Sequence, residues 1–144
     1  MTNILDVELN EDQGGDTPED MLEIIFNFQK HLEEKYKEIE RASLPCIAPD
    51  HVPVDIDSYS GQHQIKERLF NCMIEIAEAV DCMKNKSWKQ SMVETDINHL
   101  KEEMADALHF YVAACILMGI SAEELFNLYL RKNKVNQFRQ RSQY

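Results

Sequence analysis

Apolar residues recur at helical spacing through most of this chain, and short polar breaks separate the periodic stretches. The spacing predicts a first helix that opens at Thr17 and ends before a proline-containing connector at residues 42–61, and a second helix at about 62–83. A third helix is expected from Thr95 or Asp96 to Gly119, and a fourth from Ser121 into the basic C-terminus. The apolar stripes assigned to the core are Met21, Leu22, Ile25, Phe28, Leu32, Tyr36 and Ile39 in the first helix, and Leu69, Met73, Ile76, Val80 and Met83 in the second.

The polar breaks carry residues that begin and end helices. Thr17 suits an N-cap, and Ser121 with Glu124 forms a capping box. Gly119 suits a left-handed residue that ends a helix. All four prolines precede residue 61, so nothing after it forces a helix to break except Gly119. We therefore predict an all-α fold, a four- to five-helix bundle over residues 17–144, preceded by a flexible acidic arm at 1–16.

Two acidic pairs at helical spacing lie inside the apolar stretches, Glu75 with Glu78 and Glu103 with Asp106. Residues three apart share one face of a helix, so each pair points two carboxylates the same way. The short connection between the two helices predicts antiparallel neighbours, which brings both pairs together. Two carboxylates ~5 Å apart repel by roughly 3 kcal/mol at an effective dielectric of ~20. Such a cluster must protonate or bind cations, and hard oxygen ligands select Mg²⁺, Mn²⁺ or Ca²⁺ over zinc.

A simpler interpretation is that these carboxylates are solvated helix surface, as most acidic residues on helices are. The apolar context argues against it, because Glu75 adjoins the stripe of its helix and Asp106 lies in a nearly uncharged run. A carboxylate in such a place needs a partner. We expect Glu75 to be largely shielded and the third helix to be buried over much of its circumference.

Composition limits the possible functions. The formal net charge is −11, which argues against binding to nucleic acid or to an anionic membrane through the surface as a whole. A basic group near the C-terminus, which includes Arg131, Lys132 and Arg139, permits a small anionic ligand, although solubility and helix-dipole compensation would also explain it. The four cysteines form no C-x-x-C motif and are expected to be reduced, and no apolar leader begins the chain. We therefore expect a cytoplasmic protein.

The order of these features resembles a known family, the all-α nucleoside triphosphate pyrophosphohydrolases, which include MazG-type enzymes, dimeric dUTPases and a bacteriophage dCTP/dUTP pyrophosphatase. The motifs E-I-A-E at 75–78, K-N-K-S-W-K at 84–89 and E-E-M-A-D-A-L-H-F at 102–110 look like the family's metal-binding core. The segment A-E-E-L-F-N-L-Y-L-R-K-N-K-V-N-Q-F-R-Q at 122–140 looks like the C-terminal motif of the phage and dUTPase members.

This resemblance implies a Mg²⁺-dependent enzyme, with Mn²⁺ as a substitute, that cleaves a nucleoside triphosphate into a nucleoside monophosphate and pyrophosphate. Glu75, Glu78, Glu103 and Asp106 would be the metal ligands and the catalytic residues, with one of them orienting the attacking water. The residues implied for substrate binding are Gln29 and Trp88 at the nucleobase, and Lys132, Asn133, Asn136, Arg139 and Tyr144 at phosphate or sugar. The resemblance also implies a homodimer or homotetramer.

One departure from the family pattern bears on base choice. Glu33 stands where dUTPases have an Asn four residues after the glutamine. A carboxylate only accepts hydrogen bonds, so Glu33 would favour cytosine or guanine over uracil. We expect dUTP or dCTP as substrate, with dGTP or dATP as the alternative. A non-catalytic acidic helical adaptor is the alternative from another class.

Overall fold

The computed structural model describes residues 20–43 and 51–142, and this part of the chain is helical without any strand. Helix α1 spans Met21–Ser43, α2 Tyr59–Asp81, α3 Ile97–Leu117 and α4 Ala122–Arg141. The predicted all-α class is confirmed. The acidic arm at 1–16, the N-cap at Thr17, Cys46 and Tyr144 lie outside the described residues.

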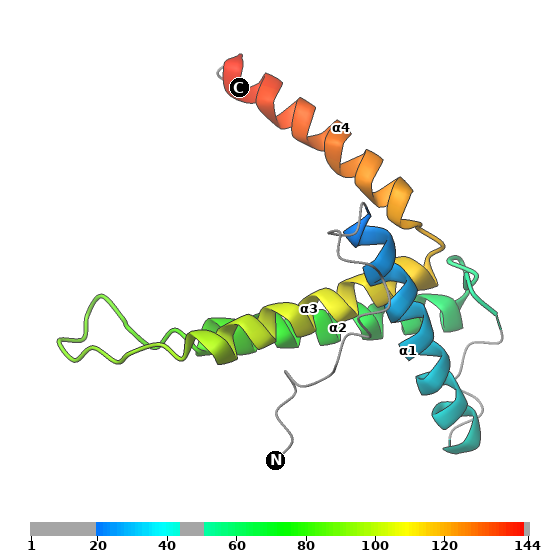
Figure 1. Cartoon of the computed structure of the whole chain (residues 1–144), viewed down its shortest axis with the longest axis horizontal. Helices are drawn as coiled ribbons and strands as arrows, with labels where there is room; N and C mark the ends of the chain where they lie inside the picture. Colours follow the sequence, from blue (N-terminus) through cyan, green and yellow to red (C-terminus); the bar gives the residue numbers. More distant parts are fainter. Residues whose placement is uncertain (1–19, 44–50, 143–144) are drawn as a thin grey trace, which may run out of the picture.

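Helices α2 and α3 form a long antiparallel hairpin, as the short connection between them predicted (Figure 1). Helix α1 crosses the hairpin near the end that carries the start of α4, and α4 then projects away from the other three helices (Figure 1). Among the described helices, α4 approaches only α1 closely. The loop of residues 82–96 extends from the opposite end of the hairpin (Figure 1).

Side chains next to each helix determine where it begins. The Asp96 carboxylate accepts hydrogen bonds from the backbone N–H groups of Asn98 and His99, both at 3.1 Å. Ser121 Oγ accepts from Glu124 N at 3.1 Å, which confirms the predicted cap of α4. Helix α2 begins three residues earlier than expected, because Ser58 Oγ accepts from Gly61 N at 2.9 Å and caps the helix there.

The turn between α3 and α4 depends on Gly119. Its φ of 75° confirms the predicted left-handed residue, a conformation that side-chain-bearing residues rarely adopt. An added Cβ would also lie 3.0 Å from Pro53 Cβ. Pro53 belongs to the loop before α2, and the next residue of that loop, Val54, donates a hydrogen bond of 2.9 Å from its backbone N to Leu117 O of α3. Gly119 therefore permits both the reversal of the chain and the close approach of the loop.

The core lies where α1 and the start of α4 meet the second half of α3. Residues 112–117 of α3 are all buried, whereas Met104, Leu108 and Tyr111 are exposed, so the prediction that this helix is enclosed over much of its circumference is confirmed only for its second half. Phe26 of α1 and Val112 of α3 are fully buried side chains at the centre of this cluster. On α2, the buried face consists of Gly61, Ile65, Cys72 and Ala79.

The predicted buried stripes of α1 and α2 are wrong for the single chain. Phe28, Ile39, Met73 and Val80 are each at least 60% exposed. On α1, Phe26 and Gln29 are buried, and the half-buried Glu33 lies on the same face. Glu33 turns inward because it pairs with Arg68 of α2, a contact that hydrophobic periodicity does not show. Most of the two apolar stripes is left uncovered, although Leu22 packs against the core and Leu32 is half-buried.

Taken singly, no helix within residues 20–43 and 51–142 is long and apolar enough to cross a membrane. Helices α3 and α4 pass that test only as a pair bent by 107°, by length and composition alone.

Candidate metal centre

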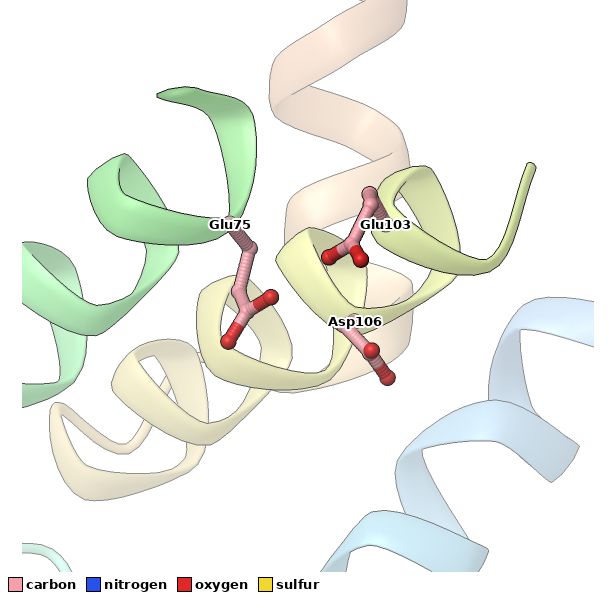
Figure 2. Close-up of side chains that lie close together, drawn as sticks. All are labelled: Glu75, Glu103 and Asp106. Carbon is pink, nitrogen blue, oxygen red and sulfur yellow. The ribbon is translucent and has the colours of Figure 1, made fainter. Parts of the chain in front are cut away.

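Three of the four predicted carboxylates come together between the two hairpin helices. These residues are Glu75 of α2 and Glu103 and Asp106 of α3. Each contributes one carboxylate oxygen, and the three oxygens lie within 4.8 Å of one another. In Figure 2, Glu75 and Glu103 face each other, and Asp106 projects from the next turn of α3. We call these three residues the carboxylate cluster.

Close packing of α2 against α3 holds the two sides of the cluster at a fixed separation. Cys72 Sγ donates to Ala107 O at 3.2 Å, one turn before Glu75 and directly after Asp106. Ala79 and Ala107 are buried at the same interface, and such small side chains let the two helices approach closely. The carboxylates are therefore held in place by the backbones of both helices.

The electrostatics of the cluster show that negative charge is not neutralised there. Burial, followed by the neighbouring carboxylates, raises the pKa of Glu75 to about 7. Glu103 is 7% exposed, and its Oε2 has no hydrogen-bond partner among the described residues. Its Oε1 lies 3.3 Å from His99 Nε2 on the same helix. A bound cation would favour the charged form of these carboxylates.

The chemistry of the donors fits a divalent cation. All three side chains offer carboxylate oxygens, which are the ligands of hard cations such as Mg²⁺, Mn²⁺ and Ca²⁺. The partnerless Glu103 Oε2 is a buried acceptor aimed into the cluster region. A cation bound there would satisfy this oxygen and remove the repulsion that raises the pKa of Glu75.

Glu78, the fourth predicted ligand, is exposed and lies outside the cluster. Its charge still reaches the site, because it is one of the groups that raise the pKa of Glu75. Glu78 is one helical turn from Glu75, so a rotamer change is enough to bring it closer.

A second group of polar residues connects α1 to the hairpin. Gln29 is buried, with 5% of its surface exposed, and its Oε1 lies 2.8 Å from His109 Nδ1 on α3. Gln29 Nε2 donates to Glu33 Oε1 at 3.0 Å, and Arg68 of α2 donates to Glu33 Oε2 at 2.9 Å. We call these four residues the Arg68 network. Both oxygens of Glu33, the predicted base contact, already have partners.

Gln29 and His109 also line a pocket of about 450 Å³ between α1 and α3. Its other walls are mostly apolar, with Ile25, Phe28 and Leu108 among them. His109 follows Asp106 by three residues on α3, so the pocket and the carboxylate cluster adjoin along the same helix. A pocket with apolar walls and a few polar groups is typical of small-ligand sites.

The remaining predicted substrate residues are separate from the cluster in a single chain. Trp88 lies in the loop at the free end of the hairpin, is 76% exposed, and has Lys86 Nζ 5.5 Å from its ring centroid. Helix α4 carries the predicted phosphate contacts and makes no close backbone contact with α2 or α3. Of these contacts, Lys132, Asn136 and Arg139 are exposed and Asn133 is half-buried.

Sequence reasoning gave no role to His109, Arg68 or His99. The signal for His109 was present, because it follows Asp106 at helical spacing in an otherwise apolar run. No comparable signal marked Arg68, whose partner Glu33 is 35 residues away in the chain.

A comparison with known protein families shows the family of this chain. A family model described as dUTPase matches residues 21–116, which include α1, α2 and nearly all of α3. The chain belongs to this dUTPase family. The resemblance stated from the sequence is thereby confirmed, and the chain is a nucleoside triphosphate hydrolase.

The chain is also similar to the dCTP pyrophosphatase of Enterobacteria phage T4. The two are 25% identical over 145 residues, which cover 87% of this chain and 83% of the phage protein. This match therefore extends over most of both chains. No solved structure gave a significant match.

Proposed function

We propose that this dUTPase-family member is a Mg²⁺-dependent pyrophosphohydrolase that converts a deoxynucleoside triphosphate into the monophosphate and pyrophosphate. The observation that carries the proposal is the carboxylate cluster, whose repulsion a divalent cation would relieve. When bound, Mg²⁺ neutralises the triphosphate and activates water for attack on phosphorus. Mn²⁺, which takes similar oxygen ligands, would substitute for it.

The residues of the chain have separate roles in binding the cation and the nucleoside. Glu75, Glu103 and Asp106 hold the cation, with Glu78 one turn away, and one of these carboxylates orients the attacking water. The pocket beside Gln29 and His109 receives the nucleoside, because it is apolar and adjoins the cluster along α3. Its volume of about 450 Å³ falls in the range of small-ligand sites and suits a single nucleoside.

A pyrimidine is the expected base. The family model is described as dUTPase, and the phage relative is named a dCTP pyrophosphatase. We therefore propose dCTP and dUTP as substrates of this chain. Gln29 is the proposed base contact, and its buried amide retains one N–H that neither Glu33 nor His109 uses.

We further propose that the active form is a homodimer or a homotetramer. Apolar side chains remain exposed on α2 and on α4, among them Met73, Val80, Phe126 and Phe138. Most of the stability of a helix in a protein comes from packing of its apolar face, which α4 largely lacks within one chain. A second copy would cover these surfaces. It would also bring Trp88, Lys132, Asn133, Asn136 and Arg139 toward a cluster that they do not reach within one chain.

The location of the protein is also a proposal. Cys72, Cys82 and Cys115 are free thiols in the structure. Free buried thiols suit a reducing compartment, so we propose a cytoplasmic enzyme.

The direct test is pyrophosphate release from dCTP, dUTP, dGTP, dATP and dTTP, each with Mg²⁺ and with excess chelator. We expect turnover of dCTP or dUTP with Mg²⁺ and none with chelator. Turnover that persists with chelator would contradict the metal role. Release of inorganic phosphate in place of pyrophosphate would contradict the proposed reaction, and a preference for dGTP or dATP would replace the pyrimidine assignment.

A further inference from the structure

The Arg68 network joins three helices through one chain of polar contacts. Arg68 of α2 pairs with Glu33 of α1, and Glu33 accepts a hydrogen bond from Gln29 of the same helix. Gln29 then contacts His109 of α3. Arg68 also lies 4.0 Å from Glu40, so the guanidinium has carboxylates from two turns of α1 beside it.

The hydrogen-bond directions along this network are fixed by chemistry. The Glu33 carboxylate paired with Arg68 can only accept, so the amide nitrogen of Gln29 must face it. The amide oxygen of Gln29 therefore faces His109. Because an amide oxygen can only accept, the proton of His109 must be on Nδ1. A neutral His109 then carries no proton on Nε2, which is left as a hydrogen-bond acceptor.

Burial makes these directions costly to reverse. The side chains of Arg68 and Glu33 are 15% and 14% exposed, and Gln29 is 5% exposed. Rotating the Gln29 amide would remove the hydrogen bond that Gln29 donates to Glu33 and place two acceptor oxygens against each other there. Leaving a buried polar group without a partner is unfavourable, so the observed orientation is preferred. Arg68 therefore controls, through two intermediates, which nitrogen of a distant imidazole bears the proton.

His109 is placed where this choice affects a ligand. It lines the pocket between α1 and α3, is itself exposed, and lies one helical turn from Asp106 of the carboxylate cluster. Gln29 lines the same pocket from α1, and His109 is the member of the network that lies on the helix carrying Glu103 and Asp106. Whether His109 Nε2 carries a proton therefore determines whether it donates to or accepts from a nucleoside bound in this pocket.

We propose that the Arg68 network holds His109 in the Nδ1–H tautomer, so that Nε2 accepts a hydrogen bond from a donor group of the bound nucleoside. Arg68 and Glu33 are positioning residues in this scheme, since they act through Gln29. The donor is either a sugar hydroxyl or the exocyclic amino group of the base. The substrate part of this inference rests on the proposed function, whereas the tautomer part does not.

The tautomer can be measured without any substrate. Nitrogen-15 NMR of the histidine rings, at a pH where they are neutral, distinguishes protonated from unprotonated nitrogens. We expect His109 to show a protonated Nδ1 and an unprotonated Nε2. In the double variant Glu33→Leu with Arg68→Met, which replaces the ion pair by apolar side chains, we expect a mixture of the two tautomers.

His63, an exposed residue of α2 outside the network, is the internal control and should give the same signals in both proteins. An Nε2–H tautomer in the unaltered protein would overturn the proposal. So would unchanged His109 signals in the double variant. Melting temperatures of both proteins establish that each is folded.

Kinetics test the acceptor. Asn keeps a donor near the position of Nδ1 but has no equivalent of Nε2, so His109→Asn removes only the proposed contact with substrate. Losing one such hydrogen bond should raise KM about three- to tenfold with little change in kcat. His63→Asn is the matched control and should leave both constants unchanged.

Substrate analogues identify the donor. If a sugar hydroxyl is the donor, His109→Asn should no longer raise KM for the 2′,3′-dideoxy nucleotide. If the exocyclic amino group is the donor, His109→Asn should raise KM for dCTP but not for dUTP. An equal penalty for all of these substrates, or no penalty, would refute the contact. Absence of any turnover by the unaltered protein would refute the proposed function instead, and the NMR result would still decide the tautomer.

Discussion

The carboxylate cluster and the Arg68 network share helices α2 and α3, but charge is accommodated differently in the two regions. In the network, a guanidinium, a carboxylate, an amide and an imidazole each contact the next, and opposite charges are paired, although Arg68 Nε has no hydrogen-bond partner among the described residues. In the cluster, carboxylates approach one another, a buried oxygen of Glu103 has no partner within the described residues, and the pKa of Glu75 is raised to about 7.

This difference distinguishes a structural arrangement from one that awaits a ligand. A polar group whose partners all come from the chain stabilises the fold by itself. Carboxylates gathered without a counter-ion cost stability, and the proposed cation would relieve that cost. The two regions should therefore respond in opposite directions when a charge is removed.

The largest expected effect is on activity. Asp106→Asn and Glu75→Gln should each lower kcat/KM by at least about 100-fold, since even outer-shell partners of metal ligands typically contribute 10–100-fold. Glu102→Gln is the matched control, because Glu102 is an exposed neighbour of Glu103 on the same helix. Pyrophosphate release measures the effect, and near-normal turnover in either cluster variant would remove the cluster from the mechanism.

The second effect is on the free energy of unfolding. Arg68→Met leaves Glu33 half-buried without its cation and should destabilise the protein by about 3 kcal/mol, the usual cost of breaking a buried pair. Glu75→Gln should instead stabilise the metal-free protein, because it removes repulsion. Denaturant titrations with chelator present compare the two. A change of the same sign in both variants would show that the two regions do not differ as described.

A third effect concerns pH. The pKa of Glu75 is raised in the folded state from 4.5 to about 7, so the folded protein holds a proton that the unfolded chain releases. The stability of the metal-free protein should therefore fall as pH rises from about 4.5 to about 7.

Mg²⁺ competes with that proton, so its affinity should rise with pH up to about 7 and then level off. Titration calorimetry and thermal denaturation at several pH values measure both trends. Glu75→Gln should flatten them, and an unchanged pH dependence in this variant would assign the effect to another group.

The smallest effect is expected for Trp88, which belongs to neither region in a single chain. Because its side chain is 76% exposed, Trp88→Ala should leave the melting temperature unchanged. Its proposed contact with the nucleobase should appear as a rise in KM of a few fold, by loss of stacking. Lys86→Ala, which removes the cation over the same ring, is the companion variant and should have less effect. An unaltered KM in Trp88→Ala would remove Trp88 from the site.

The sequence by itself determined the features that depend on near neighbours in the chain. Asp96 and Ser121 cap helices because their side chains reach N–H groups two or three residues on. Gly119 ends α3 because its backbone adopts a left-handed conformation. Helical spacing likewise placed Glu103 and Asp106 on one face of α3, and the short connection made α2 its antiparallel neighbour.

Only the tertiary structure decided which faces are covered and which polar groups meet. The apolar stripe of α1 marks a face that prefers burial, but the pattern does not say what covers it, and in the single chain Glu33 turns inward to Arg68 instead. The contact of Gln29 with His109 joins residues 80 positions apart. Helical spacing predicted that Glu78 joins the cluster, but its side chain lies outside it. Periodicity records one residue's preference for water or for the interior, whereas hydrogen bonds and ion pairs depend on the relative positions of two helices.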